Sequence, residues 1–115
     1  ATFEPWQNKV TIVQKYVSDH NSSREQTLDD FFNNQTEEHL FLKMDIEGAE
    51  RHALAGCKNL FQNCQKLDFA ICTYHLHDDE AVISAFLDKH NCIYTNQKGF
   101  FRHKIRSVVM RGSKS

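Results

Sequence analysis

The sequence predicts an α/β fold, namely a three-layer sandwich, or part of one, built on a mixed sheet. Apolar runs typical of strands alternate twice with helical segments, and continuous apolar strands joined by helices are typical of parallel strands covered on both faces. The chain then ends in short runs of strand character, with a turn signal at Lys98-Gly99 that predicts an antiparallel terminal hairpin. With 115 residues, 40% hydrophobic and 25% charged, the chain suits a single domain, residues 1–115.

The first part of the chain is expected to hold two strands and a short helix. Residues 10–17 (VTIVQKYV) are rich in β-branched and aromatic side chains and alternate in polarity, which favours a strand followed by a polar loop. The segment TLDDFFNN predicts a short helix with Thr27 as its N-cap and two aspartates in its first turn. The second strand is expected at residues 40–46 (LFLKMDI).

The rest of the chain continues the alternation. From Gly48 to Phe61 the apolar residues follow the i, i+4, i+8 stripe of an amphipathic helix. Residues 68–75 (DFAICTYH) predict a third strand, after which Asp78 or Asp79 begins a helix that ends near Lys89. The closing strands are expected in CIYTNQ, GFFRH and IRSVVMR, at residues 92–97, 99–103 and 105–111.

Charge and cysteine content exclude several classes of protein. The formal net charge of -1 provides no field that would attract nucleic acid or an anionic membrane, and no stretch is apolar for long enough to span a bilayer. Signal-peptide features are also absent, so a cytoplasmic protein is expected. The four cysteines are far apart and form no C-x-x-C pair, which argues against a structural zinc site and favours buried thiols in a reducing compartment over disulfides.

Three charged residues recur at every second position of the second predicted strand. Lys43, Asp45 and Glu47 therefore share one face, opposite to Leu42 and its apolar neighbours. Unpaired buried charges are costly, so the charged face should open into a crevice at the carboxyl end of the strand, where open α/β sheets bind ligands. Lys43 lies deepest and is expected to be paired structurally, whereas Asp45 and Glu47 are the functional candidates.

The turn after this strand adds to the expected site. Gly48 allows the backbone to turn tightly into the helix, whose first free N–H groups favour an anion such as Glu47, Glu50 or a ligand carboxylate. The next strand ends at Tyr74-His75, so His75 should approach the two carboxylates if the strands are adjacent and parallel. His75 is then either a general base or a histidine that only caps the strand end.

A metal site is the less favoured interpretation of the HLHDD segment. The histidines and aspartates of this segment, His75, His77, Asp78 and Asp79, could bind a metal ion together with Asp45. Asp78 and Asp79 are better explained as the N-cap and first-turn acids of a helix. No metal is therefore predicted.

The order TLDDFF, then FLKMDIEGAERHALAG, then DFAICTYHLHDD resembles the FkbM-type family of S-adenosylmethionine-dependent methyltransferases over roughly residues 10–111. The resemblance implies a Rossmann-like class I methyltransferase fold with an antiparallel last strand. On that pattern residues 10–17, 40–46 and 68–75 resemble the third, fourth and fifth strands, and the closing hairpin the sixth and seventh. The cofactor, S-adenosylmethionine, would lie across the carboxyl ends of the first four strands.

The resemblance also implies roles for single residues. Asp45 would lie near the transferred methyl group, and Asp19 in the region that commonly contacts adenine, unless Asp19 is only an acid of a polar loop. The family's activity suggests O-methylation of a hydroxyl on a small-molecule acceptor, a sugar or a secondary metabolite. His75 or Asp45 would be the base, and Glu47 would orient the acceptor or act as the other base.

The family's glycine-rich cofactor loop has no counterpart here, since the only glycines are Gly48, Gly56, Gly99 and Gly112. Glu4 is a weak substitute for the acid that binds the ribose. The chain therefore looks like the C-terminal part of a methyltransferase domain, an incomplete fragment that is expected to be inactive alone. The alternative is a non-catalytic α/β module that pairs with a separate N-terminal half or forms a homodimer through an exposed sheet edge.

Overall fold

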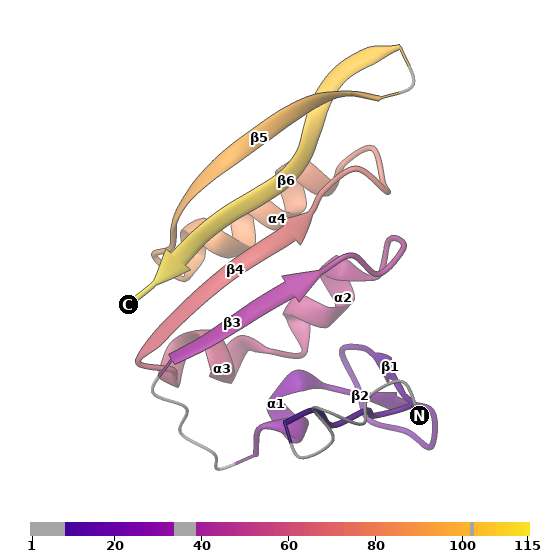
Figure 1. Cartoon of the computed structure of the whole chain (residues 1–115), viewed down its shortest axis with the longest axis vertical. Coiled ribbons are helices and arrows are strands. Elements are labelled where there is room, and N and C mark those ends of the chain that lie inside the picture. Colours follow the sequence, from indigo (N-terminus) through magenta and orange to yellow (C-terminus); the bar gives the residue numbers. More distant parts are fainter. Residues whose placement is uncertain (1–8, 34–38, 102) are drawn as a thin grey trace.

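The computed structural model describes residues 9–33, 39–101 and 103–115, so Glu4 lies outside the described residues. Four strands form the main sheet in the order β3-β4-β6-β5 (Figure 1). β3 and β4 are parallel, whereas β6 is antiparallel to both β4 and β5. The predicted mixed sheet with an antiparallel terminal hairpin is confirmed. These strands are β3 (His39–Met44), β4 (Lys66–Cys72), β5 (Ile93–Phe101) and β6 (Lys104–Lys114).

Three helices connect the strands and lie behind the sheet in Figure 1. They are α2 (Glu50–Ala55) and α3 (Lys58–Asn63) between β3 and β4, and α4 (Asp79–Lys89) between β4 and β5. The single helix predicted for residues 48–61 is therefore divided at Gly56 and Cys57. None of the helices in the described part of the chain is long and apolar enough to cross a membrane.

The division between α2 and α3 is caused by the short helix α1 (Leu28–Phe31), which begins at the predicted N-cap Thr27. Asp29 of α1 accepts hydrogen bonds from the backbone N–H groups of Asn59 and Leu60, so its carboxylate caps α3 from outside. Gly56 lies so close to the loop that contains Ser18 that a Cβ atom at this glycine would be 2.2 Å from the Ser18 carbonyl oxygen. These contacts favour two short helices over one long helix.

The hydrophobic core lies between the sheet and these helices. Alternate residues of β4 are buried, and the ring of Phe61 from α3 packs against Phe69 of β4 and Phe86 of α4, with centroid distances of 5.9 and 5.1 Å. Full burial of one such side chain stabilises the fold by about 1.5–3 kcal/mol. The largest fully buried apolar side chains are Phe61, Phe69, Leu54, Leu67, Ile71, Ile83, Leu87 and Met110.

The opposite face of the sheet is open among the described residues. Phe41 is 64% exposed and Ile93 is 80% exposed, and they lie at the two ends of one row of paired residues that crosses all four strands through Asp68 and Ser113. The main sheet and the helices that cover its other face thus form two of the three predicted layers (Figure 1). The third layer remains a prediction.

The strand predicted at residues 10–17 is mostly wrong. Only Tyr16–Val17 is a strand (β1), and it pairs in parallel with β2 (Glu25–Gln26) in a separate two-stranded sheet. The backbone of this segment bonds to the loop that follows it, since Tyr16 N–H donates to the Arg24 carbonyl and Ser18 N–H to the Gln26 carbonyl. Residues 16–17 therefore pair with the nearby strand β2 and do not join the main sheet.

The turn predicted at Lys98-Gly99 is also displaced. Both residues lie inside β5, next to a register shift between Gln97 and Lys98, and the strand continues to Phe101, which pairs with Lys104 at the start of β6. A Cβ atom at Gly99 would lie 2.9 Å from Cγ2 of Val108. This glycine therefore permits a close cross-strand contact, a role that its sequence context cannot distinguish from a turn.

Candidate functional site

The turn between β3 and α2 positions the first two candidate residues. Asp45 and Glu47 follow the end of β3, and the chain reverses at Glu47 and Gly48, which have φ angles of 58° and 98°. The left-handed conformation is easy for glycine and strained for most other residues. Gly48 thus has the predicted turn role. Asp45 is 45% exposed and Glu47 89% exposed, so both carboxylates reach open solvent.

Glu50, at the start of α2, is the buried anion of this turn. Its side chain is fully buried and its two carboxylate oxygens accept hydrogen bonds from the backbone N–H groups of Ile46 (3.2 Å) and Gly48 (3.0 Å). A buried carboxylate is tolerated when such donors satisfy it. Glu50 therefore fastens the end of β3 to the beginning of α2. The sequence indicated only that an anion would fit here and left open which one.

His75 follows β4 and meets these carboxylates, as the adjacent parallel strands predict. Its side chain is only 10% exposed, and its Nδ1 atom lies 2.8 Å from a carboxylate oxygen of Glu50. On the other edge of the ring, Nε2 lies 3.5 Å from Asp45 and 3.8 Å from Glu47. Neither ring nitrogen is solvent accessible, and neither forms an aligned hydrogen bond with a described residue. His75 is therefore enclosed by three carboxylates from one neighbouring turn.

Tyr74 completes the group and was not singled out by sequence reasoning. Its hydroxyl donates a hydrogen bond to Asp45 (3.2 Å), and its ring packs on the His75 ring at a centroid distance of 4.1 Å. Burial and the nearby Asp45 carboxylate raise the pKa of the Tyr74 phenol, so it remains a hydrogen-bond donor at neutral pH. Its only sequence signal was its place at the strand end.

Lys43 does not have the predicted role. Its side chain is exposed, and no ion pair or hydrogen bond joins its ammonium group to another residue in the part of the chain that the structure describes. The alternation placed it correctly on the face of Asp45, but that face is open, so burial does not demand a partner.

Arg51 connects the site turn to the loop that carries His75. Its guanidinium contacts Asp78 (2.6 Å) and Asp79 (2.8 Å) at the start of α4. Asp79 also accepts a hydrogen bond from the Leu76 N–H. The two aspartates lie at the helix start as predicted, although Asp78 forms no side-chain cap. The hydrogen bond to Arg51 lowers the pKa of the Asp78 carboxyl.

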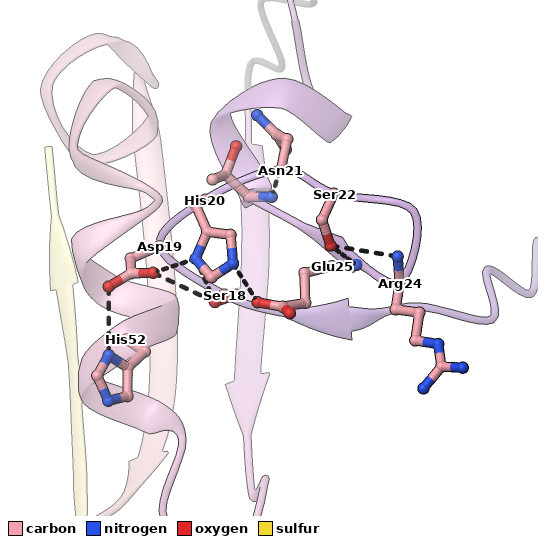
Figure 2. Close-up of polar contacts among 9 residues, drawn as sticks. Ser18, Asp19, His20, Asn21, Ser22, Arg24, Glu25 and His52 are labelled. Carbon is pink, nitrogen blue, oxygen red and sulfur yellow. Dashed lines mark hydrogen bonds and ion pairs between the residues drawn. The ribbon is translucent and has the colours of Figure 1, made fainter.

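Asp19 lies elsewhere. Figure 2 shows its carboxylate between the imidazoles of His20 (2.7 Å) and His52 (3.3 Å). Hydrogen bonds from these two imidazoles lower the pKa of Asp19 to about 2, and the bond from His20 has the larger effect. Among the described residues, no hydrogen bond or ion pair joins this exposed cluster to Asp45 or His75, so the structure does not bring all the predicted site residues into one group.

A polar pocket of about 240 Å³ lies beside the end of β4. Thr73 and His77, two residues before and two after His75, line it together with Glu80 and residues 104–107 of β6. Hydroxyl, carboxylate and cationic groups therefore share one recess.

Comparisons with known proteins agree with the sequence resemblance. The profile of the methyltransferase FkbM domain matches residues 5–97. The crystal structure of methyltransferase FkbM from Methylobacillus flagellatus KT is similar with a TM-score of 0.70 and 18% identity, covering 96% of this chain and 31% of that chain. This chain thus spans less than a third of the length of that relative, and at this identity the likeness shows the fold. No curated protein matches.

The Arg51–Asp78 contact predicts an acid-dependent stability. Because Arg51 lowers the pKa of Asp78, the contact stabilises the fold above the ordinary aspartate pKa of about 3.9 and is lost as pH falls through the lower folded-state value. The melting temperature of Asp78→Asn should therefore lie below that of the unchanged protein near neutral pH and converge with it in acid. Thermal melts in an Arg51→Leu background provide the control, where Asp78→Asn should have little effect. An equal difference at every pH would contradict the contact.

Proposed function

Because the chain belongs to the methyltransferase FkbM domain family, we propose that it takes part in S-adenosylmethionine-dependent methyl transfer to a hydroxyl of a small-molecule acceptor. The supporting observation is the group of Asp45, Glu47 and His75 at the carboxyl ends of two adjacent parallel strands. Ligands of open α/β sheets bind in this position. These residues could contact S-adenosylmethionine or the acceptor, because the side chains of Asp45 and Glu47 face solvent.

Methyl transfer to a hydroxyl needs alignment and a base. When bound, S-adenosylmethionine supplies an electrophilic methyl group, whose transfer to oxygen releases a neutral thioether and the hydroxyl proton. Asp45 is the better base of the two candidates, because its carboxylate is accessible whereas Nε2 of His75 is buried behind it. The Tyr74 hydroxyl then holds Asp45 in position, and Glu47 orients the acceptor hydroxyl.

The cofactor site needs more than this chain's described residues provide. We propose that the chain is the C-terminal part of a Rossmann-like, three-layer domain, and that the glycine-rich cofactor loop and the covering of the open sheet face come from another segment. The chain by itself is then inactive. Asp45 would lie near the methyl group and Asp19 near adenine. In that position the hydrogen bonds of Asp19 with His20 and His52 would either have to rearrange or contribute to adenine binding.

The acceptor class is proposed from the pocket beside β4. Its lining by hydroxyl, carboxylate, imidazole and cationic side chains fits an acceptor with several hydroxyl groups, such as a sugar or a hydroxylated secondary metabolite.

A second candidate function is supported by the sheet itself. In the described part of the chain no strand pairs with the outer edge of β3, and Phe41 of that strand is largely exposed. An unpaired edge is a template for another chain. We therefore keep, as the alternative, a non-catalytic module that forms a homodimer or pairs with a separate N-terminal half.

Replacement of the proposed base should reduce turnover. Asp45→Asn in the whole gene product should lower kcat for methyl transfer to a sugar panel by about 10²–10⁴-fold, because general-base catalysis typically contributes that much. Labelled methyl transfer from S-adenosylmethionine is the measurement, with Asp88→Asn on α4 as a matched control expected to retain activity. Unchanged turnover of Asp45→Asn would remove Asp45 from this role. Micromolar binding of the cofactor by the 115 residues alone would contradict the incomplete cofactor site.

The alternative has its own measurement. Sedimentation of the isolated chain should show a dimer if the edge of β3 mediates association, and Phe41→Glu should return it to a monomer because a charge at an exposed edge opposes pairing. A monomer at all accessible concentrations would reject self-association.

A further inference from the structure

We propose that Asp45, Glu47 and His75 bind a divalent first-row transition-metal cation. The three residues offer one imidazole nitrogen and two carboxylate oxygens that lie within 4.8 Å of one another. The proposal rests on the proposed function for its catalytic consequence only, since cation binding itself can be measured without a cofactor or acceptor.

The first argument is the state of His75. Its side chain is nine-tenths buried, and its ring nitrogens form no aligned hydrogen bond with any residue that the structure describes. A buried polar group without a partner typically costs about 1–3 kcal/mol. The Nε2 atom faces two carboxylate oxygens that are too distant to accept a hydrogen bond from it. A cation between these three atoms would satisfy all of them.

The second argument is the spacing of the ligand atoms. Two ligands that each lie about 2.1 Å from a shared metal ion are about 3.5–3.8 Å apart when their bond angle is about 110–130°. The distances from Nε2 of His75 are 3.5 Å to Asp45 and 3.8 Å to Glu47, which fit that range. The side chain of Glu47 is the most exposed of the three, so it can adjust its position to complete the site.

The third argument is Glu50. Histidines that bind metals commonly present their second ring nitrogen to a carboxylate, which fixes the ring and its tautomer. Nδ1 of His75 lies 2.8 Å from the buried Glu50 carboxylate, and a small rotation of the ring would align its N–H with the oxygen. Two backbone N–H groups hold Glu50 itself. Glu50 is therefore a positioning residue for His75.

The donor set selects the class of cation. Mg²⁺ and Ca²⁺ prefer oxygen ligands alone, whereas imidazole combined with carboxylates suits Zn²⁺ and its first-row neighbours. Two carboxylates also balance the charge of a divalent ion. The exposure of Asp45 and Glu47 leaves coordination positions open to solvent, where an acceptor hydroxyl could bind. Metal binding would make that hydroxyl more acidic, and the free oxygen of Asp45 would take its proton.

No metal was predicted from the sequence because the ligands considered with Asp45 were those of the HLHDD segment, His75, His77, Asp78 and Asp79. In the structure Arg51 forms ion pairs with both aspartates and His77 lines the neighbouring pocket, so His75 is the member of that segment that lies beside Asp45. The burial of His75 between Glu47 and Glu50 depends on the turn after β3, which no spacing rule describes.

The test is a calorimetric titration of the metal-free 115-residue chain with Zn²⁺, with Mg²⁺ as a competitor. We expect one Zn²⁺ per chain, undisturbed by Mg²⁺. Asp45→Asn and Glu47→Gln should weaken binding by at least about 10-fold, and Glu50→Gln by about 10–100-fold, as is typical of residues that orient metal ligands. His77, which is exposed and lies two residues after His75, provides the matched control. His77→Ala should leave the affinity for Zn²⁺ unchanged.

Co²⁺ absorption spectra identify the ligand atoms, because the chain also contains free cysteines. A spectrum without thiolate charge-transfer bands, lost in Glu47→Gln, supports the site. Glu47 is an exposed residue, so its variant should fold normally, which circular dichroism verifies. Failure to bind Zn²⁺, or equal binding by Glu47→Gln and the unchanged chain, would overturn the proposal. Neither result depends on methyl transfer, so the metal site and the proposed activity can fail separately.

Discussion

The buried carboxylate of Glu50 is the interaction on which the candidate site depends. It accepts hydrogen bonds from the Ile46 and Gly48 N–H groups and contacts Nδ1 of His75 on its other side. A buried charge is stable only while such partners remain, so the carboxylate requires the turn and the histidine to stay in place. The unusual backbone of Glu47 is held by the same contacts, which makes the positions of Asp45 and Glu47 a consequence of Glu50.

A second contact extends this unit across the sheet. Arg51, the next residue of α2, binds Asp78 and Asp79 at the start of α4, and Asp79 holds the Leu76 N–H. The loops after β3 and β4 are thereby joined on both sides of His75. The two parallel strands provide the scaffold, and these two neighbouring residues of one short helix fix the loops that carry the chemistry.

Periodicity predicted the features that follow from regular structure. The two faces of β3, its pairing with β4 and the approach of His75 to Asp45 depend on strand geometry alone. Periodicity could not predict whether Lys43 is paired, because that depends on whether its face of the sheet is covered. The burial of Glu50 was not foreseeable either, since it results from the left-handed turn before α2. Residues 10–17 have strand composition, yet their backbone bonds to the adjacent loop.

The most direct test of this account compares the two glutamates of one turn by chemical denaturation. Glu50→Gln should lower the free energy of unfolding by about 1–3 kcal/mol, because the amide removes the charge and cannot accept both backbone hydrogen bonds. Glu47→Gln, at the exposed position of the same turn, should change it by less than about 0.5 kcal/mol. Equal small effects of both substitutions would show that the buried carboxylate does not hold the site together.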